Sequence, residues 1–355
     1  MQYITRAGAA LALLLALAWP GPAAARKNAP PEVIEWVAPW REGVTLRYAT
    51  ESDDVAIDAD GKERSRTTAI ETIRITAAHD DGFVQEWRFA DARYEQLEGG
   101  SEQEALVRQA LESLPDLALE VDLDASGNFR RLRNVDQLVD ALRPVLLDVF
   151  EQALQSGIRA GGGLPGAADG EATPADVRLA AAGIADRMTR PDFLGALLSR
   201  DAAAYNDLFG AVLKAGVPLD VDIEMDGPLG LGQMPARVTL LMTPGAPGSD
   251  EAVLDWTTRF SREKSAEIAL AAAEHLYGIG ASDDERAQVM ADMSIIDTGH
   301  ARFRRSTGVP LMMETLRTVQ AAGGHWVERR RMRLLDDTHG HAWPDDGEPR
   351  PVAAP

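Results

Sequence analysis

The segment from Leu219 to Asp226 alternates apolar and acidic residues, and this pattern constrains the fold more than any other feature of the chain. On one side of an extended backbone it places Leu219, Val221, Ile223 and Met225, and on the other Asp220, Asp222, Glu224 and Asp226. A period of two predicts a β-strand with one buried face and one solvated face. Such strands favour an antiparallel sheet, because the strands of parallel sheets are usually apolar on both faces.

The same alternation recurs along most of the chain. It predicts a strand at Val44–Tyr48, a hairpin from Thr68 that turns at His79 and returns through Phe89, and a strand at Leu117–Leu123. Further strands are expected at residues 236–242, 254–260, 302–306, 309–319 and 326–335.

Helices are predicted between these strands, because apolar residues recur there at spacings of three and four. They are Glu102–Leu114, a helix capped by Asn134 and kinked or split at Pro144, one opened by Thr173-Pro174, and Phe193–Leu213, Glu263–Tyr277 and Asp283–Met293. The order of elements predicts an α+β fold with antiparallel, curved β-sheets and helices packed over one face. Phe129-Arg-Arg and Phe303-Arg-Arg are short echoes, so two related β units with helical insertions remain open.

The first 25 residues have the order of a secretory signal peptide. Arg6 is followed by an apolar run too short to span a membrane, and then by Ala23-Ala24-Ala25. We therefore expect cleavage after Ala25, a periplasmic or secreted protein, and no transmembrane segment after cleavage. The rest divides into an N-terminal β-rich unit with helices (26–160), a flexible loop (161–175), a helical block followed by a C-terminal β-meander (176–344) and a disordered tail (345–355).

Composition and motifs argue against several classes of protein. The chain has no Cys, which excludes disulfides and thiolate chemistry. Its net charge of -20 becomes -21 when Arg6 is removed with the signal peptide, which argues against nucleic acid as a partner. No nucleophile elbow, phosphate-binding loop or zinc-protease motif is present. We expect no cofactor, lean against an enzyme, and infer nothing about oligomeric state.

The segment Val121–Leu132 resembles a calcium-binding loop in the spacing of Asp122 and Asp124. Arg133 stands where the twelfth-position Glu is needed, and the flanking residues are strand-like rather than helical. Asp, Ser and Gly between two strands instead predict a hairpin turn.

Other acidic and histidine residues offer weak signals for chemistry. The pairs Asp53-Asp54, Asp80-Asp81 and Asp283-Asp284 are interpreted as solvated turn residues, because adjacency alone does not place two acids across a substrate. His339 and His341, with several Asp residues nearby, are weak metal candidates.

Two constellations are candidate binding sites. If the last three strands form a meander, their arginines make a basic strip for an anion or a partner: Arg302, Arg304, Arg317, Arg329, Arg331 and Arg333. Cross-strand ion pairing to acids such as Asp220, Asp222 and Glu224 explains the same arginines and is the favoured interpretation. The second is an apolar lining for a lipid or other apolar ligand, although ordinary core packing is the favoured interpretation of the same residues: Phe83, Trp87, Phe89, Trp256 and Phe260.

The leading hypothesis is an exported, non-catalytic binding module for a hydrophobic or amphipathic ligand. One-sided strands with helical covers resemble, at the level of architecture alone, the exported lipid-carrier half-barrels of bacterial envelopes. The first alternative is an envelope structural or protein-interaction protein that docks through a sheet face or the arginine strip. The second is a hydrolase that uses carboxylates or a His/Asp metal site.

Overall fold

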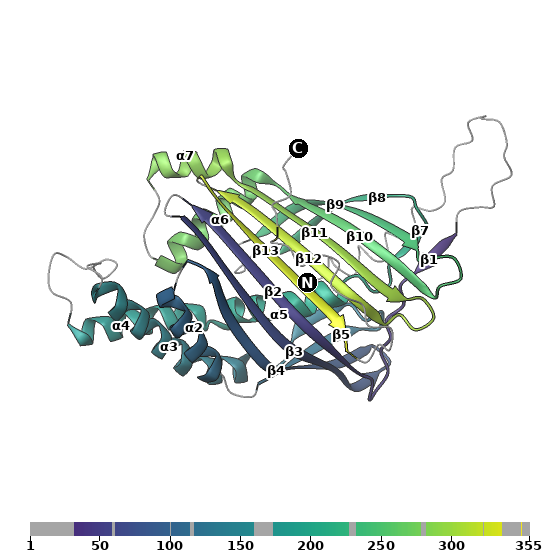
Figure 1. Ribbon diagram of the computed structural model, residues 1–355, viewed down its shortest axis with the longest axis horizontal. Helices are drawn as coiled ribbons and strands as arrows, with labels where there is room; N and C mark the ends of the chain where they lie inside the picture. The colour runs from purple at the N-terminus through teal and green to yellow at the C-terminus, as the bar shows by residue number, and fades with distance from the viewer. Residues whose placement is uncertain are drawn as a thin grey trace.

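The computed structural model describes residues 32–58, 61–99, 101–113, 117–159, 173–226, 232–277, 282–321, 323–335 and Pro349. Within them the chain forms one large antiparallel sheet, a two-stranded sheet and six helices (Figure 1). The predicted signal peptide, most of the 161–175 loop, His339 and His341, and all of the predicted tail except Pro349 lie outside the described residues.

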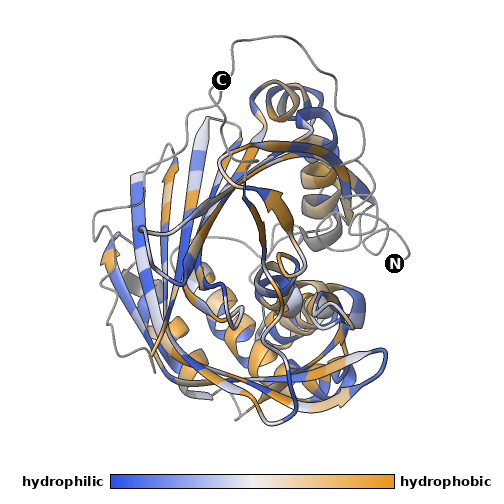
Figure 2. Ribbon diagram, turned by 90° about the vertical axis from the view of Figure 1, so that its right-hand side faces the viewer, coloured by the Kyte–Doolittle hydropathy of each residue, from blue (hydrophilic) through white to orange (hydrophobic). Residues whose placement is uncertain are grey.

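The large sheet has eleven strands in the order β6-β5-β4-β3-β2-β13-β12-β11-β10-β9-β8. The strands are β2 (Thr45–Asp58), β3 (Gly61–His79), β4 (Gly82–Glu98), β5 (Ala118–Asp124), β6 (Phe129–Leu132), β8 (Leu219–Asp226), β9 (Gln233–Pro244), β10 (Glu251–Phe260), β11 (Ser294–Arg304), β12 (Pro310–Ala321) and β13 (Gly324–Leu334). The sheet is strongly curved and does not close, since β6 and β8 are its two edges (Figure 2). The predicted antiparallel, curved sheet is confirmed.

The sheet consists of two meanders joined at its centre. β2 to β6 run outward in one direction and β13 back to β8 in the other, so that strands adjacent in sequence pair with each other. α2 lies between β4 and β5, and α6 and α7 lie between β10 and β11. β2 and β13 are the first and last strands of the large sheet along the chain, and they pair antiparallel at its centre, which places Asp53 opposite Arg329. Both sets of strands therefore belong to one sheet. A separate two-stranded sheet pairs β1 (Val33–Glu35) with β7 (Val212–Lys214).

The six helices are α2 (Ser101–Ser113), α3 (Val135–Arg159), α4 (Pro174–Met188), α5 (Pro191–Asn206), α6 (Arg262–Tyr277) and α7 (Asp283–Asp292). Thr173 caps α4 as predicted, in a capping box with Asp176. α3 continues as one helix through Pro144. The side chain of Asn134 bonds to β5, accepting from the backbone N of Glu120 at 3.0 Å. None of the described helices is both long enough and apolar enough to cross a membrane.

The main core lies between α5, the segment before β2 and one face of the sheet. We call this the inner face, which carries Tyr48, and the opposite face, which carries Asp53, the outer face. Tyr205 of α5 donates or accepts a hydrogen bond of 2.9 Å with the Tyr48 hydroxyl, and its ring contacts Trp87 edge-on at 5.4 Å. Trp36 stacks on Phe303 of β11 at 4.3 Å. These aromatic contacts fix α5 on the inner face.

The calcium-like segment is a hairpin turn between β5 and β6, as predicted. One carboxylate oxygen of Asp124 accepts hydrogen bonds from the backbone N of Ser126 at 2.8 Å and of Asn128 at 3.0 Å. Gly127 has a φ of 90°, and a Cβ there would lie 2.5 Å from the Cβ of Ala38. Glycine is required at this turn for both reasons.

Candidate functional site

The predicted apolar lining lies on the inner face, in two groups separated by five strands. Phe83, Trp87 and Phe89 are on β4. Trp87 is buried and donates from Nε1 to the side-chain oxygen of Gln85 at 2.6 Å, so it is a core residue. Phe83 is partly buried against the same core, whereas Phe89 is 40% exposed. The other two residues, Trp256 and Phe260, are half-buried, and Trp256 also packs against the main core; both belong to a wider half-buried apolar surface.

That surface covers the inner face of three strands at one end of the sheet. Cross-strand pairing aligns Leu219, Leu240 and Trp256 in one row, Val221 and Val238 in the next, and Ile223 and Phe260 with buried Ala236 in a third. We call the half-buried members the β8–β10 apolar surface: Leu219, Val221, Ile223, Val238, Leu240, Trp256 and Phe260. Side chains stacked across neighbouring strands in this way form a continuous apolar layer.

The indole of Trp256 packs against the backbone of Gly299 on β11. A Cβ built on Gly299 would lie 1.9 Å from Cζ2 of Trp256, so the ring lies directly over the glycine backbone. A glycine in the middle of a strand often marks such a close approach. The position of Trp256 is therefore set by its cross-strand neighbour.

An open hollow of about 560 Å³ lies at the end of this surface. Its apolar lining includes Ile223, Ala236 and Phe260, and charged residues such as Asp222 and Arg259 complete it. The volume is within the range of about 300–1,000 Å³ typical of small-molecule sites. Its mixture of apolar and charged lining suits an amphipathic molecule.

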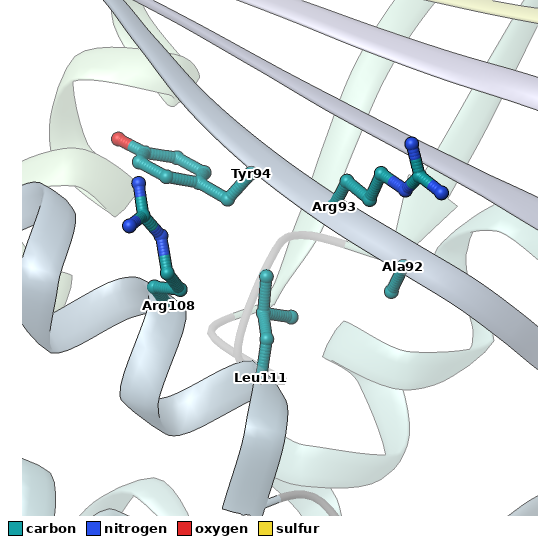
Figure 3. A pocket seen from close by; sticks show the side chains of 5 residues that line it. All are labelled: Ala92, Arg93, Tyr94, Arg108 and Leu111. Carbon is teal, nitrogen blue, oxygen red and sulfur yellow. The ribbon is translucent and has the colours of Figure 1, made fainter.

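A second hollow of about 350 Å³ lies between α2 and β4. Figure 3 shows Tyr94 and Arg108 on facing sides of it, with Leu111 below and the guanidinium of Arg93 directed away from Arg108. Arg108 also pairs with Glu104, one helical turn away. This hollow shares no lining residue with the β8–β10 apolar surface.

A row of charges crosses the inner face beside the apolar surface. Arg317 binds Asp297 through Nε at 2.8 Å and Nη2 at 2.6 Å. Glu328 is the next residue in the row and accepts a hydrogen bond of 3.0 Å from the guanidinium of Arg200 on α5. Asp54 of β2 lies directly opposite Glu328 and extends the row. The inner charged band is defined as Asp54, Glu71, Asp297, Arg317, Glu328 and Arg330 of the sheet with Arg200 and Asp201 of α5.

Arg330 is the centre of the band near the core. Its guanidinium lies 2.6 Å from Glu71 and also binds Asp201 of α5. Burial raises the pKa of Glu71 above its usual value even though Arg330 lowers it. Burial and then repulsion by Glu328 raise the pKa of Asp54 to about 6. The band therefore contains carboxyl groups that are easier to protonate than ordinary surface acids.

The three strands of the predicted arginine strip do form a meander, but the six arginines do not share one face. Arg317 lies on the inner face because the register places it between Asp297 and Glu328. The other five lie on the outer face: Arg302, Arg304, Arg329, Arg331 and Arg333. The prediction that Arg317 belongs to the same strip as the other five arginines is therefore wrong.

The acidic partners of these arginines also differ from the predicted ones. Arg331 pairs with Glu51 and Arg329 with Asp53, both on the neighbouring β2. Asp220, on the edge strand β8, instead binds Thr239 and Arg237 of β9. Two strands separate β8 from β11, so the β8 acids are too distant to pair with the strip.

The interpretation of Asp53-Asp54 as turn residues is wrong. Both lie in the middle of β2, and Asp53 is 0% exposed. Asp80 and Asp81 do form an exposed turn, whereas Asp283 and Asp284 are exposed residues at the start of α7. A sequence signal for Asp53 existed, because a tight turn after Asp58 brings Arg66 directly opposite it.

Asp53 is held by three arginines. It accepts from Arg64 through Nε at 3.0 Å and Nη2 at 2.7 Å, from Arg66 at 2.9 Å and from Arg329 at 3.4 Å. Burial opposes ionisation, but the bonds from Arg64 and Arg66 outweigh it and hold the pKa of Asp53 below its usual value. Asp53 is thus an ionised, buried carboxylate. Among the described residues, no group of three or more His, Asp or Glu side chains is arranged to hold a metal ion.

Comparison with known proteins assigns no family. No protein-family model matches the sequence, and a search of curated proteins found no match. Among solved structures, the chain is similar to one described as lipid–protein interactions in lipovitellin, with a TM-score of 0.39 and 8% identity. The similarity covers 87% of this chain and 27% of the lipovitellin chain. The chain thus spans about a quarter of that protein's length, and a likeness this small assigns neither a family nor a ligand.

Proposed function

We propose that the mature chain is an exported, non-catalytic binding module whose inner face takes an amphipathic ligand. The β8–β10 apolar surface would hold the apolar part, and the neighbouring inner charged band would hold the polar part. The observation that carries the proposal is the continuous row of half-buried apolar side chains that ends in the hollow at Phe260. Large accessible apolar surfaces are uncommon on soluble proteins unless they bind something.

The two parts of the proposed site are adjacent. Thr258 follows Trp256 by two residues on the inner face of β10, and its cross-strand neighbour is Asp297 of the charged band. Asp297 is bound by both ends of the Arg317 guanidinium. A ligand whose chain covers Trp256 would therefore bring its polar end to Arg317.

In this proposal, α5 and α6 would enclose the ligand. α5 contacts the sheet through Tyr205 and through Arg200, which binds Glu328. α6 approaches the apolar surface, where the Ser265 hydroxyl lies 3.5 Å from the sulfur of Met234. The proposed ligand would lie between these two helices, on the part of the sheet that neither covers completely.

The first experiment is native mass spectrometry of the protein purified from the exported fraction, followed by organic extraction. We expect an acyl-chain compound to copurify with the protein at a fixed molar ratio. The measured polypeptide mass should correspond to a chain whose first residue is Arg26. Contact is then tested by titration with a lysophospholipid that carries bromine on its acyl chain, because bromine quenches tryptophan fluorescence only at short range. Quenching should be lost in Trp256→Phe and retained in Trp326→Phe.

A matched pair of variants separates a specific surface from general stickiness. Ile223 and Asp220 both lie on β8, but their side chains are on opposite faces of the sheet. Burying an Ile side chain contributes about 1.5–3 kcal/mol, and Ile223 is already half buried. We therefore expect Ile223→Ser to weaken lysophospholipid binding about fivefold and Asp220→Ser, outside the lining of the hollow, to leave it unchanged. Absence of copurifying ligand together with absence of quenching in the unaltered protein would refute the proposal.

A further inference from the structure

We propose that the inner face selects a ligand with an ammonium group, which Asp54 and Glu328 bind beside the indole of Trp326. This site extends the proposed function, on which it rests, by naming the chemistry of the ligand's headgroup. We call Asp54, Glu328 and Trp326 the ammonium site.

Strand register brings the three side chains of the site together. Asp54 of β2 and Glu328 of β13 are directly opposite each other on the inner face. Trp326 faces the same way two residues before Glu328, and its own cross-strand partner is Ala56, two residues after Asp54. Trp326 and Asp54 are therefore diagonal neighbours, at a separation of about 7–8 Å that an aromatic side chain can bridge. All three side chains are half-buried.

Asp54 has no bonded cation in the described part of the chain. Its carboxylate accepts a hydrogen bond of 3.3 Å from the Ser52 hydroxyl. Its cross-strand neighbours are Glu328, which repels it, and Ser65 of β3, which is uncharged. Arg200 of α5 favours its ionisation only through space, because the Arg200 guanidinium is bonded to Glu328. A half-buried carboxylate in this position is costly when ionised and is stabilised by an added cation.

The other sheet and helix acids of the inner charged band already have arginine partners. Asp297 is bound by Arg317, and Glu71 and Asp201 share Arg330. A ligand's cation at any of these acids would have to displace an arginine. At Asp54 the same cation forms an additional ion pair.

Trp326 suits the apolar surface of an ammonium group. The face of an indole attracts a cation that lies within about 6 Å of the ring centre, and aromatic rings commonly contact quaternary ammonium groups. Because Trp326 is half-buried, part of its ring remains available for contact. The two carboxylates supply the charge attraction, and they also accept hydrogen bonds when the ammonium is primary.

The ammonium site is aligned with the β8–β10 apolar surface. One row of cross-strand neighbours on the inner face runs from β10 to β2: Thr258, Asp297, Arg317, Glu328 and Asp54. Neighbouring strands are about 4.8 Å apart, so Glu328 is about 14 Å from the strand that carries Trp256. An acyl chain on Trp256 would therefore direct its headgroup along this row. A phosphate and an ammonium joined by two carbons suit Arg317 and Glu328, which are on adjacent strands.

Two lysophospholipids with the same brominated acyl chain test the headgroup. One carries phosphocholine, which has a quaternary ammonium, and the other carries phosphoglycerol, which has none. Each is titrated into the full mature chain below its micelle-forming concentration at constant ionic strength, and tryptophan quenching gives the dissociation constant. We expect the phosphocholine lipid to bind about tenfold more tightly, as one charge-assisted contact would give.

Matched variants separate this site from the overall negative charge of the protein. Asp54→Asn and Asp220→Asn each remove one negative charge, but Asp220 is on the outer face of β8. The preference should fall to about twofold in Asp54→Asn and stay about tenfold in Asp220→Asn. Asp54→Asn should fold, since it removes a half-buried charge that lies beside Glu328. Trp326→Leu should lower the preference about threefold and leave phosphoglycerol binding unchanged.

The preference should also decrease as the pH falls through the pKa of Asp54, which is about 6, because protonation removes the charge that attracts the ammonium. Burial and repulsion by Glu328 raise this pKa, Arg200 of α5 lowers it, and Asp53 on the opposite face adds a small repulsion. From β3, the nearest ionisable side chain on the inner face is the exposed Glu63. Neither headgroup titrates in this range, so in Asp54→Asn the preference should not change with pH.

The outcomes distinguish this site from the proposed function. Equal affinities of the unaltered protein for the two lipids, or a preference that persists in Asp54→Asn, would overturn the ammonium site and leave the proposed function intact. Absence of quenching by either lipid would overturn both.

Discussion

Replacing Arg330 by Met should destabilise the protein strongly, because this arginine joins α5 to the inner face of the sheet. Its guanidinium lies 2.6 Å from Glu71 and binds Asp201 of α5. The Glu71 side chain is 4% exposed, and its second carboxylate oxygen has no partner in the described residues. Methionine keeps much of the length and apolar contact of the arginine, so the main change is the loss of charge and of hydrogen bonds.

The expected magnitude follows from the burial of the two partners. Removing one member of a buried ion pair costs about 3–5 kcal/mol, and the lower end applies because the Arg330 side chain is 21% exposed. Asp201 is 30% exposed, so its pair with Arg330 adds only about 0.5–1 kcal/mol. The free energy of unfolding should therefore fall by about 3–4 kcal/mol, which is measured by urea denaturation.

The pH dependence of this loss gives a sharper test. The pKa of Glu71 is already raised by burial and should rise further without Arg330. A folded-state pKa above the unfolded value means that the folded protein binds the proton more tightly, so stability falls as pH rises between the two values. The unfolded value is 4.5, so the deficit of Arg330→Met should be small near that pH and largest well above it. Glu71→Gln in the same chain should recover much of the loss.

The reasoning would be refuted by a loss below about 1 kcal/mol that does not change with pH, since Glu71 would then have to be solvated or neutral in the unaltered protein. Recovery by Glu71→Gln at high pH, but none near its unfolded pKa, is the pattern that identifies the buried carboxylate as the cause.

The remaining predictions concern the core, the packing of Trp256 on Gly299 and the inner charged band. Tyr205→Phe should lower the free energy of unfolding by about 0.5–1.5 kcal/mol through loss of one hydrogen bond. Tyr48→Phe should cost more, about 1–3 kcal/mol, because the Tyr48 hydroxyl also donates to the backbone carbonyl of Pro310 at 3.0 Å, so its loss leaves both that carbonyl and the Tyr205 hydroxyl without this partner; equal losses in urea denaturation would contradict this arrangement. Gly299→Ala should cost about 1–3 kcal/mol and shift tryptophan emission, because its Cβ must displace the Trp256 indole; an unchanged spectrum would refute the close approach. Asp54→Asn should stabilise the protein by about 1–2 kcal/mol above pH 6 and have little effect below the unfolded pKa of 3.8, so a uniform effect across pH would show that Asp54 is not the raised carboxyl.

Local features of this chain were readable without the structure because they depend on a few neighbouring residues. The alternating segment Leu219–Asp226 forms strand β8, the segment around Asp124 forms a hairpin turn, and Thr173 caps helix α4, as predicted. Each rests on side-chain periodicity or on a hydrogen bond to a nearby backbone group. Asn134 was expected to cap the helix that follows it. Its side chain instead accepts from the backbone N of Glu120 and donates to the backbone carbonyl of Ala118, because the fold places β5 next to it.

The candidate sites depended on relations between strands, which the sequence does not specify. Alternation shows which residues of one strand share a face, but the face shared by two strands depends on their register. Arg317 illustrates this. The meander was predicted correctly, yet its register places Arg317 on the other face of the sheet from the remaining five arginines. Trp87 and Trp256 looked equivalent as apolar strand residues, yet Trp87 is buried against Tyr205 of α5 and Trp256 is only half-buried.

By itself the sequence determined the strands, the turns between them and the approximate helices, because hydrogen bonding and apolar periodicity act over short stretches of chain. Only the tertiary structure decided that β2 pairs with β13, which brings Asp53 and Arg329 together across 276 positions. That pairing is selected by the stability of the whole sheet, since closing so long a loop is repaid only when many strands pack at once. The same pairing buries Asp53 among arginines and separates the apolar surface from the arginine face.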